Sequence, residues 1–170
     1  EEQGRCITFM AKWHADHFGG GLHFNHSLWR GDESAFYDPG QPDARSAVYR
    51  NWIGGVMATM RGAQSFSFPN VNSYRRIVEL AGAPTTVTWG SDNKTTAMRA
   101  MSQSPGSARA ELRIPGADSN PYLVMAATLA GGLIGLQERL DPPPSFDGMA
   151  WGLPPEEGVQ LARSITTAAD

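Results

Sequence analysis

The chain has 170 residues, 41% of them hydrophobic, which is enough to bury one ordinary core and points to a single domain or a piece of a larger one. Its 14 basic and 17 acidic residues leave a net charge of −3, so neither a nucleic-acid partner nor a membrane partner is expected on electrostatic grounds. The single cysteine, Cys6, cannot form an internal disulfide, which favours a reducing compartment such as the cytoplasm.

The predicted elements, in chain order, mix short strands with helices, which gives an α+β fold class. Alternating polarity and β-branched or aromatic residues predict strands over residues 6–11, 22–29, 85–89, 94–101 and 108–113. Helical spacing of apolar residues and capping signals predict helices over residues 46–61, 69–81, 120–140 and from 154 onward. Residues 30–43, rich in Gly, Asp and Pro, are predicted to be a loop.

The helix over 120–140 has the strongest signals, because Asn120 is a good cap and Pro121 suits the first helical position. Its apolar run, from Tyr122 to Leu136, is shorter than the roughly 20 residues that a membrane-spanning helix needs. The helix is apolar on most sides, so we expect it to lie buried at the centre of the fold.

The strand over 108–113 has an unusual polar face. Side chains alternate across a strand, so Arg109, Glu111 and Arg113 share one face, while Ala110 and Leu112 point into a core. Two guanidinium groups beside one carboxylate suit a site that binds anions and a cation. The alternative is a solvated charged face on an edge strand.

A second polar face lies on the strand over 22–29, where His23, Asn25 and Ser27 alternate with apolar residues. The glycines at 19–21 just before it allow the backbone to approach a ligand closely, but no Gly-Lys-Ser/Thr follows them as in a phosphate-binding P-loop. On spacing alone, a structural role and a ligand role for His23 remain equally open.

Other polar groups have simpler interpretations when they are taken alone. The spacing of His14, Asp16 and His17 fits no zinc template, which indicates a polar loop. Arg75 and Arg76 are each interpreted as solvated surface charges.

Taken in order, these segments resemble the catalytic domain of the glutamine synthetase family. The matching segments are 8–12, 19–23, 27–28, 54–55, 72–76, 83–84, 93–99, 109–113 and 120–122. The resemblance is strongest over residues 6–136 and implies that residues 1–170 are that domain, truncated at both ends. It implies a partial α/β barrel of mainly antiparallel strands with packed helices.

The family joins the γ-carboxylate of glutamate to ammonia or an amine, using ATP and a γ-glutamyl phosphate intermediate. The resemblance therefore implies ATP as co-substrate, Mg²⁺ or Mn²⁺ as cofactor, and glutamate with ammonia or an amine as partners. It also implies a ring-shaped homo-oligomer whose active sites are shared between subunits, so the fragment alone should show little activity.

The resemblance also assigns roles to residues of this chain. The metal that contacts the nucleotide phosphates would be bound by His23 and Glu111. Glutamate would be bound by Gly19, Gly21, His23, Arg76 and Arg113. ATP would contact Asn25, Ser27, Arg99 and Arg109. Phosphoryl transfer would be catalysed by Lys94 and Arg99.

Three positions depart from the family pattern. Most members have a second histidine at Asn25, an arginine at Lys94 and, in ammonia-using members, a flap glutamate at Gly82. Gly82 has no carboxylate, and Glu79 would have to reach around to replace it, so a larger amine is the favoured co-substrate. Ordinary glutamine synthetase activity and a catalytically inactive structural or binding relative are the alternatives.

Overall fold

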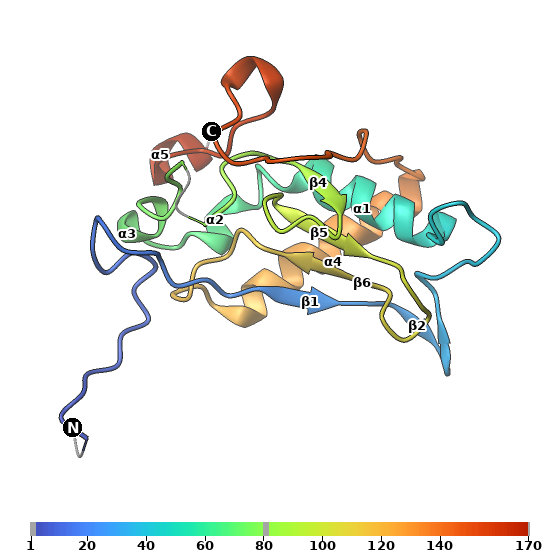
Figure 1. Ribbon diagram of the computed structural model, residues 1–170, viewed down its shortest axis with the longest axis horizontal. Helices are drawn as coiled ribbons and strands as arrows, with labels where there is room; N and C mark the ends of the chain where they lie inside the picture. Colours follow the sequence, from blue (N-terminus) through green and yellow to red (C-terminus); the bar gives the residue numbers. More distant parts are fainter. Residues whose placement is uncertain (1–2, 80–81, 170) are drawn as a thin grey trace.

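The computed structural model describes residues 3–79 and 82–169, which form an open sheet with helices packed against it (Figure 1). The sheet has the order β1-β6-β5-β4, with β1 at Phe24–His26, β6 at Arg109–Leu112, β5 at Met98–Met101 and β4 at Trp89–Ser91. The β1–β6 and β6–β5 pairs are antiparallel, and β5–β4 is parallel. The α+β class with mainly antiparallel strands is confirmed, and the sheet does not close into a barrel.

The remaining elements are short, apart from two helices. A two-stranded hairpin joins β2, Trp29–Arg30, to β3, Glu33–Ser34. The long helices are α1, Ala47–Thr59, capped by Ser46, and α4, Pro121–Glu138, capped by Asn120. The short ones are α2, Gln64–Ser67; α3, Val71–Tyr74; the single turn η1, Pro155–Glu157; and α5, Ile165–Ala169.

The two faces of the sheet have different roles. Ala110 and Leu112 on β6 lie opposite Ala100 and Met98 on β5, and all four side chains belong to the hydrophobic core with those of α1. The Tyr49 hydroxyl on α1 donates to the Arg109 carbonyl oxygen and accepts from the Met101 amide, which ties α1 to the strands. The alternate residues of β5 and β6 therefore point to the opposite face of the sheet.

Glycines allow α1 and α4 to pack closely. A Cβ atom at Gly55 would overlap the backbone at Gly131 and Gly135, and one at Gly132 would overlap the indole ring of Trp52. The helices therefore meet through backbone atoms, and no larger side chain fits at these positions without moving them apart.

Several predicted strands are shorter than expected or absent. Residues 6–11 pair with no strand in the described part of the chain, because an extended segment forms a strand only where another edge lies beside it. The strand over 22–29 is reduced to β1, and β4 begins at Trp89, where the strand over 85–89 was expected to end. Residues 94–97 form a turn, because the Asn93 side chain accepts from the amide and hydroxyl of Thr95. The predicted loop over 30–43 contains β3.

Two helix predictions also require correction. The helix expected over 69–81 ends at Tyr74, and residues 80 and 81 lie outside the described residues. Gly82 does have the left-handed backbone of a capping glycine, with φ +78°, but the described residues 75–79 are not helical. The helix expected from Pro154 is only η1, followed later by α5.

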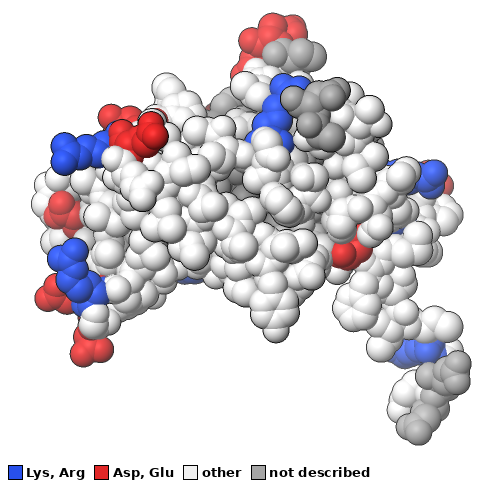
Figure 2. Space-filling model, turned by 180° about the vertical axis from the view of Figure 1, so that it is seen from behind, with Lys and Arg blue, Asp and Glu red and all other residues white. Residues whose placement is uncertain are grey.

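The expectation that α4 is central is wrong. Its small residues face α1, but Tyr122, Leu123, Leu129 and Leu133 on the other side are exposed, since nothing in the described chain covers them. From behind, the molecule shows a broad face with charged side chains mainly near its margins (Figure 2). Within the described residues, no helix is both long and apolar enough to cross a membrane.

The α1–α4 contact gives a stability prediction. Gly55→Ala should lower the free energy of unfolding by about 1 to 3 kcal/mol, because the new methyl group overpacks the contact with Gly131. Without that contact, alanine in a helix would instead stabilise by roughly 1 kcal/mol. Gly62→Ala, where a Cβ meets nothing closer than 3.7 Å, is the matched control and should be neutral or slightly stabilising in the same chemical denaturation experiment. Equal stabilities for the two variants would contradict the packing.

A buried histidine gives a second prediction. Burial lowers the pKa of His26 to about 4, and its Nε2 accepts a hydrogen bond from Trp52 Nε1 at 3.0 Å. An unfolded His26 binds a proton near pH 6.5, so stability should fall by about 2 to 3 kcal/mol between about pH 7 and pH 4.5 on this account alone. His26→Gln keeps an acceptor for Trp52 but does not titrate. Over the same pH range, the free energy of unfolding of this variant should therefore fall by about 2 to 3 kcal/mol less than that of the parent protein. Identical pH dependence of stability in the parent protein and the variant would contradict the lowered pKa of His26.

Candidate active site

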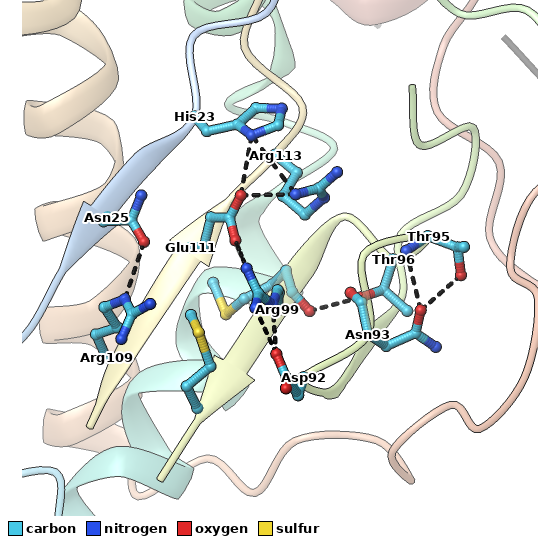
Figure 3. Close-up of polar contacts among 12 residues, drawn as sticks. His23, Asn25, Asp92, Asn93, Thr95, Thr96, Arg99, Arg109, Glu111 and Arg113 are labelled. Atoms are coloured by element: carbon cyan, nitrogen blue, oxygen red, sulfur yellow. Dashed lines mark hydrogen bonds and ion pairs between the residues drawn. The ribbon is translucent and has the colours of Figure 1, made fainter. Parts of the chain in front are cut away.

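The polar face of the sheet brings three predicted residues into one row. Asn25 on β1 lies opposite Glu111 on β6, and Glu111 lies opposite Arg99 on β5. Because the strands pair in this register, the three side chains project from the same face (Figure 3). Arg113, two residues beyond Glu111, and His23, two residues before Asn25, extend the group along the strands.

The Glu111 carboxylate is the centre of this group. Its Oε2 accepts from Arg99 Nη1 at 2.8 Å, and its Oε1 accepts from Arg113 Nη1 at 2.6 Å and lies 2.9 Å from His23 Nδ1 (Figure 3). Glu111 is only 4% exposed, and β6 is an inner strand of the sheet. The alternative of a solvated face on an edge strand is therefore wrong, and the expected proximity of position 23 to position 111 is present.

The charges around Glu111 keep it ionised. Burial by itself raises the pKa of Glu111, but the hydrogen bond from Arg99 and the Arg113 charge outweigh this and lower it. Burial and the Arg113 charge lower the pKa of His23, so its ring stays neutral at pH 7. A neutral imidazole beside an ionised carboxylate offers two lone-pair donors, which is the form that binds a metal ion.

Arg99 is held from both sides. Its Nη1 donates to Glu111 and its Nε donates to Asp92 Oδ1 at 2.7 Å (Figure 3). Burial lowers the pKa of Arg99, but the two carboxylates outweigh this and raise it. Sequence reasoning missed Asp92, which lies between the strands predicted over 85–89 and 94–101. Its left-handed φ of 50° directs the backbone so that the short side chain reaches Arg99.

Arg76 is buried rather than solvated, which corrects its interpretation as a surface charge. It is 4% exposed, and its Nη1 donates to the carbonyl oxygen of Ile114 at 2.6 Å. Burial and the neighbouring Arg113 charge lower the pKa of Arg76 to about 10, at which it remains cationic. A Cβ at Gly21 would lie 2.7 Å from Arg76 Nη2, so glycine there leaves room for the guanidinium group.

A cavity of about 490 Å³ opens beside this arginine. The described residues that line it are Phe18, Gly19, Gly21, His23, Arg76, Gly82 and Ala83. Arg113 is 7% exposed, and its Nε has no hydrogen-bond partner among the described residues. Because buried donors are normally paired, an unpaired guanidinium nitrogen in the Glu111 group favours an anionic ligand beside it.

Other predicted residues lie at the margin of the group or outside it. Arg109 donates through Nε to Asn25 Oδ1 at 3.3 Å, next to the Glu111 group. The Ser27 hydroxyl accepts from Trp29 Nε1 at 2.9 Å and does not join the group. Lys94 is exposed in the turn before β5, and its amine makes no hydrogen bond or ion pair with another described residue. Any role for Ser27 or Lys94 remains a prediction.

The loop with His14, Asp16 and His17 is exposed, and its two imidazole rings pack with the Trp13 indole. Over residues 3–79 and 82–169 there is no group of three or more His, Cys, Asp or Glu side chains that could hold a metal ion. The interpretation of this segment as a polar loop agrees with the structure.

His23 and Glu111 fit two positions of a metal site. Adjacent ligands of an octahedral ion at about 2.1 Å are about 3 Å apart, and His23 Nδ1 lies 2.9 Å from Glu111 Oε1. The further ligands would be supplied by phosphate oxygens, water or residues outside the described part of the chain.

Comparison with known proteins agrees with this geometry. The family described as the glutamine synthetase catalytic domain matches residues 1–170. A glutamate–isopropylamine ligase from a Pseudomonas species is 39% identical over 169 residues, covering 99% of this chain and 37% of that protein. The glutamine synthetases of Frankia alni and Streptomyces coelicolor are 36% and 34% identical, covering 91% and 98% of this chain and 33% and 36% of theirs.

The chain thus spans about a third of the length of these curated relatives. The match nevertheless extends over its whole length, including the strand that carries Glu111 and the glycines beside Arg76. This chain belongs to the glutamine synthetase family, as part of its catalytic domain.

Proposed function

We propose that this chain provides part of the active site of an ATP-dependent ligase that joins the γ-carboxylate of glutamate to a primary amine. The observation that carries the proposal is the buried Glu111 carboxylate between Arg99, Arg113 and His23. Such a group of charges is costly to bury for stability alone, and it is suited to a site that binds anions and a divalent cation together.

His23 and Glu111 would hold a Mg²⁺ or Mn²⁺ ion, which draws together and neutralises the phosphate oxygens of ATP when it is bound. Arg99 and Arg109 would bind those phosphates, with Asn25 and Ser27 on the nucleotide and Lys94 near the transferred phosphoryl group. Arg76 and Arg113 would bind the glutamate carboxylates, and Gly19 and Gly21 would let the backbone approach the amino acid.

The reaction has two steps in this proposal. An oxygen of the glutamate γ-carboxylate attacks the γ-phosphorus of ATP, and ADP leaves with the electron pair of the broken P–O bond. The amine nitrogen then attacks the carbonyl carbon of the γ-glutamyl phosphate, the C–O bond to phosphate breaks, and one nitrogen proton passes to solvent. Arg99, fixed between Asp92 and Glu111, would stabilise the negative charge that moves during the first step.

Gly82 supports an amine larger than ammonia. It lines the cavity beside Arg76 and contributes no carboxylate to attract ammonium or remove its proton. A relative at 39% identity is named for isopropylamine, which also favours this reading. Use of ammonia is the second candidate, since the relatives from Frankia alni and Streptomyces coelicolor are named glutamine synthetases. A catalytically inactive relative is the third.

For the whole protein we propose a cytoplasmic ring-shaped homo-oligomer. The described residues contain no group of three or more His, Cys, Asp or Glu side chains that could hold a metal ion, so in this proposal another segment or a neighbouring subunit would add ligands to His23 and Glu111, beside phosphate oxygens and water.

Amine-dependent release of ADP tests the proposal. The full-length protein with glutamate, ATP and Mn²⁺ should release ADP faster with isopropylamine than with ammonium. Glu111→Gln should reduce this rate by about 100-fold or more, because the variant loses a metal ligand and the charge that fixes two arginines. Turnover of ammonia as fast as of every larger amine would favour ordinary glutamine synthetase, and no ADP with any of them would favour the inactive relative.

Asp92 provides a separate test of how Arg99 is positioned. Asp92→Asn keeps the shape of the side chain but removes the charge that holds Arg99 Nε, so kcat should fall by about 10-fold or more while the KM for glutamate changes little. Asp32→Asn, in the exposed turn between β2 and β3, makes the same chemical change away from the site and should match the parent protein. Equal rates for the two variants would mean that Glu111 alone positions Arg99.

A further inference from the structure

We propose that Phe18 and Gly82 form the binding surface for the substituent of the amine, and that the co-substrate is a monoamine with an apolar alkyl or aryl group. This inference rests on the function proposed above. It assigns a specificity-determining side chain, Phe18, and it excludes diamines and polyamines as preferred substrates.

The first step of the argument is the contact between the two residues. A Cβ atom built on Gly82 would lie 3.3 Å from Cδ1 and 3.5 Å from Cε1 of Phe18, so the aromatic ring covers the position that a side chain at residue 82 would occupy. Both residues line the 490 Å³ cavity that contains Arg76 and His23. An aromatic ring therefore forms the wall of the cavity at this point.

The second step is the backbone at Gly82. Its φ of +78° is in the left-handed region, which side chains rarely adopt, and its space is limited by the ring. A carboxylate at this position would be strained and would also lie against an apolar surface. The local structure therefore favours glycine at residue 82, with the Phe18 ring as the wall of the cavity beside it.

The third step is charge. Among the described residues that line the cavity there is no acidic side chain, and the cation Arg76 is among them. Residues 80–83 are Leu, Ala, Gly and Ala, and the nearby Glu79 is 3.5 Å from Arg163, to which it is paired. A second ammonium group on a diamine would leave water for a surface with no acidic counter-charge among these residues, which disfavours its binding.

The fourth step is exposure. Phe18 is 72% exposed, so much of its ring is available to a ligand. An alkyl group lying on the ring would remove apolar surface from water, which favours binding by about fourfold for each methylene group buried. The ring therefore provides a reason for the site to prefer larger alkylamines over ammonia.

The test uses the full-length protein and a homologous series of amines: methylamine, ethylamine, propylamine and butylamine, with 1,4-diaminobutane as the polar counterpart of butylamine. The kcat/KM, expressed per concentration of free base, should rise by about fourfold per methylene until the cavity is filled. The diamine should be at least about 10-fold worse than butylamine in kcat/KM, because its second ammonium group finds no acidic partner among the described residues that line the cavity.

Variants of Phe18 separate a specific role from a structural one. Phe18→Ala should make kcat/KM nearly independent of the length of the alkyl chain and leave the KM for glutamate unchanged. Phe18→Leu should keep most of the increase in kcat/KM per methylene group. Phe66→Ala removes another partly exposed phenylalanine, outside the cavity, and should behave like the parent protein. Since Phe18 is largely exposed, its loss should not unfold the protein, which unfolding midpoints of the variants would check.

The outcomes distinguish this inference from the function on which it rests. A flat series in the parent protein, or a slope unchanged in Phe18→Ala, would overturn the role of Phe18 while leaving an amine ligase in place. Good turnover of 1,4-diaminobutane would overturn the monoamine assignment. The absence of glutamate-dependent ADP release with every amine would instead overturn the proposed function itself.

Discussion

The ionised Glu111 carboxylate and its three neighbours are the interaction on which the rest of the site depends. Two arginines and one histidine contact a side chain that is almost fully buried: Arg99 lies on β5, Arg113 directly after β6 and His23 directly before β1. Removing one partner from a buried ion pair costs about 3 to 5 kcal/mol, so no member can be lost without consequence for the others. In the function we propose, the charges that hold these side chains together would also bind a metal ion and anionic substrates.

The scaffold places this group by keeping the two faces of the sheet separate. Helix α1 packs on the apolar face, and α4 packs on α1 through glycines, so the opposite face is free to carry the polar row (Figure 1). Close packing by backbone atoms leaves little freedom for the strands to shift. Because the register of β1, β6 and β5 sets which residues face one another, this rigidity also sets the distances within the site.

The cavity beside the Glu111 group is charged at Arg76 and apolar at Phe18. Arg76 provides buried positive charge suited to a carboxylate, whereas Phe18 and Gly82 provide an apolar surface, and no acidic group is among the described lining residues. One cavity therefore combines a charged half and an apolar half, which is the combination that a γ-glutamyl amide of an alkylamine requires in the function we propose. In this proposal, the charged group around Glu111 and the apolar surface at Phe18 lie on different segments of the chain, so the preference for an amine can differ while the charged group is kept.

The sequence by itself determined the α+β class, the helices α1 and α4 with their caps, the side chains that share a face of β6, and membership of the family. These features depend on local periodicity, capping residues and ordered motifs, which are readable along the chain. Only the tertiary structure decided that Arg76 is buried, that Asp92 holds Arg99, that Phe18 covers Gly82, that one face of α4 is exposed and that residues 6–11 lack a partner strand. Each of these depends on segments far apart in sequence or on a turn geometry, and local patterns carry no information about which distant surface will lie beside them.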